Sequence, residues 1–445
     1  MFSSASPTQT PPVWAQPGVT DVAAARAFLQ LLRREDVLFY HSGDDEPGAT
    51  VNWLTSAARG LGFTLSRQIV AAAEPSRDLW EYHRRLGLGP EEVWVPRASR
   101  SRPLMAACLE DEEMLSRLRV DASIRALFTR YTSDRSEALA ARLGVPFTGG
   151  ARGPENCASL NDKASLAEAG RRHGFATLDA RLVFTLEELD AAFEELHCEH
   201  EAGCMLRDRQ GAGGSGLVHA PTLACARRVF GGMVGGDGVL VTPFIPQDRV
   251  IRNLSLHGVV AQDGFAPLVL TDQILKGYTY RGSRCVGELP PEHIRAVRAC
   301  LPGLGRWLLA EGYIHAPAGV DGFLLRSADG PRFVVIDPNI RLTNTIRPWS
   351  VVAALSEKAG CSFEWELEWM SFIGPRVDLA LLRQRLGRDL LHESRLDEGG
   401  VLPGYMGWLG VGLGVTRMEM LFLARGEAHL AHLRRRVTEL GMRWS

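Results

Sequence analysis

Two short apolar stretches separated by a tight turn constrain the fold of this chain more than any other feature. VDGFLLR and RFVVID flank the turn sequence SADGP. Apolar runs of this length between turn residues are typical of buried strands, so the pair predicts a β-hairpin. If Arg326 pairs with Arg332, then Asp321 lies directly opposite Asp337, and both side chains point to the same face. The hairpin would therefore bring two carboxylates together in a buried sheet.

Two opposed carboxylates repel each other unless a cation lies between them. Asn339 follows Asp337 by two residues and adds an amide oxygen on the same side of the strand. Such a set suits Mg²⁺, which takes few protein ligands and completes its coordination with phosphates and water. The alternative is that Asp321 is a turn residue and Asp337 a strand cap. We favour a metal site of Asp321, Asp337 and Asn339, because both aspartates interrupt otherwise apolar strands.

The bulk composition argues against several classes of function. The 445 residues exceed one typical hydrophobic core, so several packed subdomains are expected. The net charge of −2 gives no electrostatic reason to expect nucleic acid or an anionic membrane as a partner. No apolar run reaches the ~18–20 residues that span a bilayer. The eight cysteines are scattered without a CxxC pair, which indicates neither a disulfide framework nor a zinc ribbon.

Lysine is rare in this chain. Only Lys163, Lys276 and Lys358 stand among the 50 basic residues, so positive charge is nearly always carried by arginine. A lysine that persists is expected where a compact ammonium is needed rather than a planar fork. This directs attention to Lys163 and Lys276.

Strands and helices alternate along much of the sequence. In the first third, this alternation predicts a small α/β domain with a partly parallel sheet. From Asn161 onwards, helices and strands alternate again before several strands follow in series. The main elements expected are helices over 23–34, 53–61, 163–174, 186–197, 222–230, 291–311 and 427–440, and strands over 37–40, 93–96, 181–185, 203–208, 217–220, 238–245, 253–261 and 266–275.

A glycine-rich loop, GAGGSG from Gly211 to Gly216, matches the form of the GxGxxG motif. That motif requires a helix directly after the loop to hold the pyrophosphate of a dinucleotide. Here the strand LVHA follows, so we predict a β-hairpin tip and not a dinucleotide-binding domain. A glycine-rich hairpin can hold phosphates, because its N–H groups can converge on an anion. A flexible surface turn is the alternative.

Taken in order, these features resemble the ATP-grasp superfamily over about Asn161 to Arg347. NDK ends in Lys163, which is similar to the family's lysine at the lid entrance, and CMLRD has Arg207 in place of a second nucleotide lysine. GAGGSG resembles the phosphate-covering loop, TPFIP the adenine hinge, and D-P-N-I-R the family's E-x-N-x-R pattern. The resemblance implies an α/β fold of the ATP-grasp type, with an N-terminal pre-ATP-grasp α/β domain and a C-terminal α/β extension.

The resemblance also implies roles for individual residues. ATP and one or two Mg²⁺ ions would be the cofactors, and Arg341 would stabilise the transferring phosphoryl group. The hinge lacks the family's usual glutamate, so Gln247 or Asp248 would hold the ribose. The residues expected to bind the nucleotide are Lys163, Arg207, Gly213, Gly214, Ser215, Thr242, Phe244, Ile245 and Asp248.

Within the superfamily, the chain is most similar to the peptide ligases of natural-product pathways, such as the pheganomycin-type ligase. The similarity lies in TDQILKGYTYRGSR, in D-P-N-I-R-x-T-N-T-x-x-P and in the presence of a C-terminal domain. Lys276, Tyr278, Tyr280, Arg281 and Arg284 are expected to line the acid-substrate pocket, with Arg281 or Arg284 gripping a carboxylate. A solvated basic loop is the alternative. The candidate catalytic residues are Arg341, Arg284 and Lys276.

The implied reaction joins a carboxylic acid to an amine through an acyl phosphate, releasing ADP and phosphate. A close alternative loads an amino acid onto a carrier-protein thiol, as in the butirosin pathway. Nucleotide binding without catalysis, and a phosphotransferase that stops at phosphorylation, are further alternatives. The expected partners are small-molecule or peptide substrates. The C-terminal segment would frame the amine substrate, form a homodimer contact or serve as scaffold.

The N-terminus is rich in Ser, Thr and Pro and lacks the basic start and apolar stretch of a signal peptide, so a cytoplasmic protein with a disordered leader is expected. The expected division is a leader over 1–20, a pre-ATP-grasp domain over 21–155, an ATP-grasp domain over 156–350 (lid about 160–240, metal and substrate subdomain about 241–350) and a C-terminal domain over 351–445.

Overall fold

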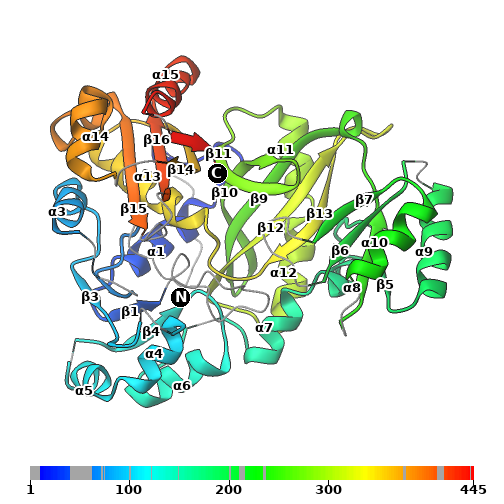
Figure 1. Ribbon diagram of the computed structural model, residues 1–445, viewed down its shortest axis with the longest axis horizontal. Coiled ribbons are helices and arrows are strands. Elements are labelled where there is room, and N and C mark those ends of the chain that lie inside the picture. The colour runs from blue at the N-terminus through cyan, green and yellow to red at the C-terminus, as the bar shows by residue number, and fades with distance from the viewer. Residues whose placement is uncertain are drawn as a thin grey trace.

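Three β-sheets organise the part of the protein that the structure describes, and their strands can be followed in the ribbon diagram in Figure 1. None of the described helices is long and apolar enough to cross a membrane. The helix expected over 53–61 lies outside the described residues. The computed structural model describes residues 11–40, 63–71, 74, 76–99, 102–121, 123–148, 150–199, 202–209, 216–233, 237–373, 377–407, 415–440 and 442–444.

The first sheet has the strand order β3-β2-β1-β4, and its three pairings are all parallel. This agrees with the parallel α/β arrangement predicted from the alternation of strands and helices. Its core strand β1 is buried on both faces, as expected for a parallel sheet covered by helices. The elements are α1 (Val22–Leu32), β1 (Val37–Tyr40), β2 (Gln68–Val70), α3 (Arg77–Leu86), β3 (Glu92–Trp94), α4 (Leu104–Glu110), α5 (Glu112–Val120), β4 (Ala126–Thr129) and α6 (Asp134–Leu143).

The second sheet is antiparallel, with the order β5-β8-β6-β7, and lies at the right of Figure 1 with α9 and α10 packed against it. Strands β6 and β7 pair directly, and Asp208 N donates to Gly216 O at 2.9 Å. The hairpin predicted around the glycine-rich loop is therefore confirmed. The elements are α7 (Pro154–Leu160), α8 (Lys163–His173), β5 (Arg181–Val183), α9 (Leu186–Glu199), β6 (Cys204–Asp208), β7 (Leu217–Ala220), α10 (Leu223–Met233) and β8 (Val239–Pro243).

The third sheet has nine strands and runs through the centre of the molecule in the order β13-β12-β9-β10-β11-β14-β16-β15, with β17 paired to β14. Strands from the predicted C-terminal domain thus extend the same sheet that carries the predicted metal hairpin. The elements are β9 (Val250–Ala261), β10 (Gly264–Lys276), β11 (Thr279–Cys285), α11 (Pro291–Arg298), α12 (Leu301–Ala310), β12 (Ala316–Leu325), β13 (Arg332–Asn339), α13 (Ile346–Ala359), β14 (Glu364–Ile373), α14 (Leu379–Leu386), β15 (Gly400–Gly407), β16 (Val415–Ala424), α15 (Glu427–Thr438) and β17 (Met442–Trp444).

Two elements of this region differ from the sequence expectation. The single helix predicted over 291–311 is two helices, because Pro302 has no N–H to donate to the carbonyl of Arg298 and so interrupts a continuous helix. The segment expected as a substrate loop between strands is itself a hairpin of β10 and β11. Gly277 makes the tight turn with a φ of 60°, a conformation that glycine adopts at little cost.

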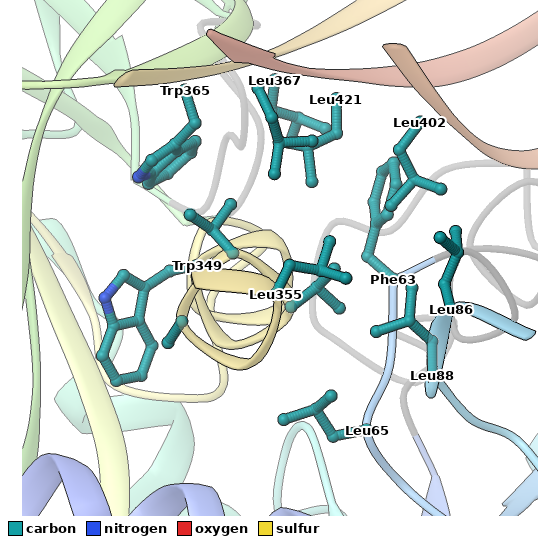
Figure 2. Packing of buried hydrophobic residues seen from close by; sticks show 14 of the residues in the cluster. Phe63, Leu65, Leu86, Leu88, Trp349, Leu355, Trp365, Leu367, Leu402 and Leu421 are labelled. Atoms are coloured by element: carbon teal, nitrogen blue, oxygen red, sulfur yellow. The ribbon is translucent and has the colours of Figure 1, made fainter. Parts of the chain in front are cut away.

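Helix α13 joins the parallel sheet to the central sheet through a shared apolar core. Figure 2 shows α13 end-on, with Trp349 and Leu355 between side chains of the central sheet, such as Leu421, and side chains of the N-terminal region, such as Phe63. All four are 2% exposed or less. Because α13 is the next helix after β13, this packing anchors the chain shortly beyond the predicted metal strand.

Candidate active site

A β-bulge places the two predicted metal-binding aspartates on one face. Asp321 pairs with Asp337, as predicted. The assumed register was wrong, however, because Arg332 pairs with Leu325 and the register shifts by one residue next to Asp321. Strict alternation would point Asp337 into the apolar core, with Val335. The extra residue of the bulge turns Asp337 to the side of Asp321 instead.

Asp321 is held by hydrogen bonds to both of its carboxylate oxygens. Ser255 Oγ of β9 donates to Oδ1 at 2.5 Å, and Asn339 Nδ2 donates to Oδ2 at 3.0 Å. Burial and the negative charge of Asp337 raise the pKa of Asp321 to about 6, against these bonds. A cation bound between the two carboxylates would oppose this shift by favouring their charged forms.

The arrangement fits a hard divalent cation such as Mg²⁺. Asp337 Oδ1 is buried and accepts no hydrogen bond among the described residues, although Lys163 Nζ lies 3.3 Å away. Asn339 adds a side-chain amide, whose Nδ2 faces Asp321 and whose Oδ1 accepts from Arg341. In the described part of the chain, no three His, Cys, Asp or Glu side chains gather around one point. Phosphates and water would therefore have to complete the coordination of the ion, as is usual for Mg²⁺ bound with a nucleotide.

Two cations from the lid region meet these carboxylates. Lys163 is the first residue of α8 and is 8% exposed, and its ammonium forms the ion pair with Asp337. Arg207 of β6 is 7% exposed and donates from Nη1 to Ile336 O at 2.9 Å. Burial lowers the pKa of Arg207, and Asp337 and Asp321 oppose that shift. Both predicted phosphate-binding cations thus lie beside the predicted metal ligands.

Arg341 is oriented by two side-chain amides. Its Nη2 donates to Asn339 Oδ1 at 2.7 Å, and its Nη1 donates to Asn161 Oδ1 at 2.5 Å. Asn161 also accepts from Ile340 N at 2.9 Å and donates to Ile340 O at 3.2 Å. It donates further to Cys157 O at 2.8 Å, so its amide is fully used. The sequence singled out NDK for its lysine and missed this role of its asparagine.

We expect Asn161→Ala to lower kcat about 10- to 100-fold, because a hydrogen bond to a charged group that fixes Arg341 is lost. The KM for ATP should change less than kcat, since the amide of Asn161 is used by Arg341 and by backbone groups. Steady-state kinetics of the ligase reaction proposed below measure both. Asn156→Ala is the matched control, since Asn156 lies in α7, the helix that Asn161 caps, and its side-chain amide also bonds backbone groups. Equal kinetic losses in the two variants would contradict a positioning role.

The predicted nucleotide hinge consists of the end of strand β8 and the short 3₁₀ turn that follows it. Thr242 is buried in β8 and pairs with Met205 of β6. Phe244 stacks on His219 with ring centroids 3.7 Å apart. Ile245 packs against a small apolar cluster, and Asp248 is exposed in the 3₁₀ turn η2 (Gln247–Arg249). Their nucleotide contacts stay predictions, and Gly213, Gly214 and Ser215 lie outside the described residues.

Arg284 points away from the candidate site. Asp321 pairs with Ser255, Ser255 with Thr271, and Thr271 with Cys285, so these four residues point to the same face of the central sheet. Successive strand residues face opposite sides, so Arg284 lies on the other face. There its guanidinium pairs with Glu427 of α15 and lies 3.9 Å from Glu366. We therefore leave Arg284 out of the proposed site, contrary to the sequence expectation.

Lys276 ends β10 at the tip of the hairpin and is exposed. No contact between Lys276 and the two aspartates is seen among the described residues, so its catalytic role stays a prediction. Tyr280, in contrast, is half-buried on the face of Asp321, where its hydroxyl lies 2.7 Å from Ser283 Oγ.

The face opposite the candidate site buries two carboxylates of β14. Glu366 and Glu368 are each 1% exposed. Arg434 of α15 lies 3.0 Å from Glu366 and 3.2 Å from Glu368. Burial and the neighbouring Glu366 raise the pKa of Glu368 well above its usual range, although Arg434 opposes this. The pair therefore holds a proton at neutral pH.

We expect Glu368→Gln to stabilise the protein increasingly as the pH rises. The folded state keeps a proton on Glu368 that the unfolded state loses above a pH of about 4.5, so the stability of the wild type falls as the pH rises from there. Glutamine needs no proton, and the variant should gain roughly 2 kcal/mol in free energy of unfolding at pH 8 but little at pH 5. Urea denaturation measures both values. Glu364→Gln, exposed on the same strand, is the control; no gain at pH 8 would contradict the shared proton.

Comparison with known proteins gives a fold match without a sequence match. No protein-family model and no curated protein matches the chain. The N5-carboxyaminoimidazole synthetase of Staphylococcus aureus has a TM-score of 0.53 at 10% identity, over 92% of this chain and 97% of that chain. The carboxyaminoimidazole ribonucleotide synthase of Aspergillus clavatus, solved with ATP, has a TM-score of 0.55 at 13% identity, over 91% and 99%.

A third solved structure is the biotin carboxylase domain of the Hydrogenobacter thermophilus 2-oxoglutarate carboxylase, in complex with MgADP and bicarbonate. Its TM-score is 0.55 at 13% identity, over 92% of this chain and 90% of that chain. At such identities the likeness shows the fold alone. All three are ATP-grasp ligases, so this chain has the ATP-grasp fold, which confirms the fold expected from its sequence.

Proposed function

We propose that this chain is an ADP-forming carboxylate–amine ligase that makes a peptide bond in the biosynthesis of a natural-product peptide. One observation supports the proposal: two carboxylates, one side-chain amide and three basic side chains lie close together around Asp337 of β13. The carboxylates and the amide are the predicted ligands of a cation. The residues of this site are Asp321, Asp337, Asn339, Lys163, Arg207 and Arg341.

The first step would transfer the γ-phosphoryl group of ATP to a carboxylate oxygen of the acid, forming an acyl phosphate and releasing ADP. Such transfers need charge neutralisation and in-line positioning more than covalent help from the protein. Lys163 and Arg207 would hold phosphate oxygens, and Arg341 would stabilise the charge on the transferred group. Mg²⁺ bound by Asp321, Asp337 and Asn339 would neutralise further phosphate charge.

In the second step the amine nitrogen would attack the acyl carbon. The bond from that carbon to the phosphate oxygen breaks, phosphate leaves with the electron pair, and the nitrogen loses a proton. Because water would hydrolyse the acyl phosphate, the site must be closed during the reaction. The predicted lid is the glycine-rich loop between β6 and β7.

The proposal is tested by incubating the protein with ATP, Mg²⁺ and panels of amino acids and peptides, and by following ADP release and product masses. Hydroxylamine is added in parallel, since it converts an acyl phosphate to a hydroxamate without needing the natural amine. Acid-dependent ADP release with a hydroxamate and an amide product supports the proposal. A thioester on a carrier protein would favour the carrier-loading alternative, and a stable phosphorylated product a phosphotransferase. No acid-dependent ADP release would leave only nucleotide binding.

A further inference from the structure

The tripeptide from Asn161 to Lys163, between α7 and α8, contacts both sides of the candidate site. Its first and last residues bond to side chains in or just after β13 of the central sheet. The middle residue, Asp162, instead forms an ion pair with Arg209, which directly follows β6 of the second sheet. No step of the proposed reaction involves Asp162 or Arg209, so this ion pair calls for a separate explanation.

Both carboxylate oxygens of Asp162 accept hydrogen bonds. Oδ1 accepts from Ala164 N at 3.0 Å and so caps the N-terminus of α8. Oδ2 accepts from Arg209 Nε at 2.8 Å and from Arg209 Nη2 at 2.5 Å. Capping needs a single acceptor oxygen, which asparagine or serine supplies about as well as aspartate. The second oxygen and the negative charge of Asp162 are therefore explained by Arg209.

The ion pair connects two separate hydrophobic cores. Leu166 of α8 belongs, with Leu304 of α12, to a core on the central sheet. Leu206 of β6 belongs, with Phe193 of α9, to the core of the second sheet. Units with cores of their own are expected to shift relative to each other unless contacts between them prevent it. A polar contact between α8 and the end of β6 therefore helps to set how the second sheet sits against the central sheet.

Shielding from solvent makes this pair stronger than an ordinary surface ion pair. The side chains of Asp162 and Arg209 are 12% and 33% exposed, and two N–H groups of the guanidinium bond the carboxylate. Charge-assisted bonds of this kind are among the strong hydrogen bonds of proteins, whereas exposed ion pairs contribute little. The hydrogen bond with Asp162 raises the pKa of Arg209, although burial opposes this. That direction is expected for a guanidinium whose charge is balanced by Asp162.

The pair lies next to the two cations that are predicted to hold phosphates. Asp162 directly precedes Lys163, and Arg209 follows Arg207 by two residues. Lys163 is part of α8, and Arg207 is part of β6. The two cations thus belong to elements with different cores, and the Asp162–Arg209 pair is a short link between their backbones. Loss of this link would let the distance between the two cations vary.

We propose that Asp162 and Arg209 are positioning residues that keep Lys163 and Arg207 at the spacing required by the phosphates of a nucleotide. This rests on the nucleotide binding that the proposed function requires. Asp162 neutralises Arg209, so Arg209 acts through the placement of Arg207 and does not itself hold phosphate. Because both cations are in place before the nucleotide arrives, less of the binding free energy is used to order them.

Titration calorimetry with ADP and Mg²⁺ tests this role without turnover. Asp162→Asn keeps a capping oxygen and removes the charge, and Arg209→Gln removes the guanidinium. Each should raise the dissociation constant of MgADP about 5- to 20-fold, as expected when a charge-assisted hydrogen bond that orders the site is lost. A dissociation constant within about 2-fold of the wild-type value in either variant overturns the proposal. Tighter binding by Asp162→Asn also overturns it, because a released Arg209 would then bind phosphate itself.

The two residues should act as one unit. In Asp162→Asn/Arg209→Gln, the dissociation constant should lie within about 2-fold of that of the weaker-binding single variant. If the two losses multiply instead, the residues act separately and the shared role is wrong.

The matched controls are Asp190→Asn and Arg227→Gln. Arg227 likewise donates from Nε and Nη2 to its aspartate, at 2.8 Å and 2.5 Å. This pair joins α9 to α10 within the second sheet's own core, so neither control should change the dissociation constant by more than about 2-fold. A rise in the controls as large as that in the test variants contradicts a role specific to Asp162 and Arg209.

Steady-state kinetics distinguish positioning from a general loss of structure. Contacts made equally in the ground state and the transition state change KM and leave kcat unchanged. In Asp162→Asn the KM for ATP should therefore rise about 5- to 20-fold, with kcat within about 3-fold of the wild-type value. A fall in kcat with an unchanged KM contradicts the proposal.

The binding test is independent of the ligase function. Unchanged MgADP binding by variants of a protein that forms hydroxamate would leave the ligase function standing and remove the role of Asp162 and Arg209. Raised dissociation constants in a protein that releases no ADP with any acid would support the positioning role and remove the ligase function.

Discussion

Replacing Asp337 with asparagine should reduce turnover about 1000-fold at saturating ATP and Mg²⁺ while the protein stays folded. The substitution keeps the shape of the side chain and removes one of two facing carboxylates. It therefore weakens the attraction for a divalent cation, and it takes the ion-pair partner away from Lys163. ADP release across a Mg²⁺ titration measures the effect, and far-ultraviolet circular dichroism reports the fold.

The matched control is Asp329→Asn. Asp329 lies in the exposed turn of the same β12–β13 hairpin, so this variant makes the same chemical change at a distance from the candidate site. It should keep near-normal turnover. If Asp337→Asn also turned over at close to the wild-type rate, neither the metal site nor the proposed role of the hairpin would survive.

The hairpin itself could be predicted, but the cause of its geometry could not. Apolar runs and turn residues identify the two strands, and a simple ladder from Arg326 and Arg332 happens to bring Asp321 opposite Asp337. The structure reaches that pairing with a different register and a bulge. The apolar faces of β12 and β13 set this register, because Phe333 and Val335 must reach the core. The sequence of a single strand does not reveal the extra residue of the bulge, because a bulge is defined only relative to the partner strand.

Contacts between residues far apart in the sequence could not be predicted either. Asn161 and Arg341 are 180 positions apart, and Ser255 and Asp321 are 66 apart. Asparagine and serine are common at helix caps and in turns for purely local reasons, so neither residue type marks a site by itself. Lys163 was easier to find, because lysine is rare in this chain and Lys163 begins a helix.

The segment around Arg284 shows that residue types alone do not predict a substrate pocket when the face of the sheet to which each side chain points is unknown. Its basic and aromatic residues suggested one substrate pocket, but a strand sends neighbouring side chains to opposite faces. Tyr280 and Ser283 lie on the face of Asp321, whereas Arg284 pairs with Glu427 on the other face. The bulge in the β10–β11 hairpin, next to Ile274, changes the alternation once more. Without the pairing register, the charge and type of these residues could not predict which face of the sheet each side chain occupies.

Arg341→Lys should lower kcat about 100- to 1000-fold, because lysine keeps the charge but cannot form the two-pronged contact of a guanidinium. Arg341 now bonds both Asn339 and Asn161, and an ammonium on a flexible stem would hold neither in the same geometry. Single-turnover ADP release reports the phosphoryl-transfer step directly. Arg332→Lys, an exposed change at the start of β13, the strand that precedes Arg341, should leave the rate near that of the wild type.

Combining this variant with Asn161→Ala tests whether the two residues act as one unit. If Asn161 acts through Arg341, the alanine substitution should cost less than about 3-fold in the Arg341→Lys background, although it costs about 10- to 100-fold in the wild type. If the two losses simply multiply, Asn161 acts by another route, such as its hold on the backbone of Ile340. The cycle thus separates the orientation of one guanidinium from the placement of the whole strand end, which no single substitution can do.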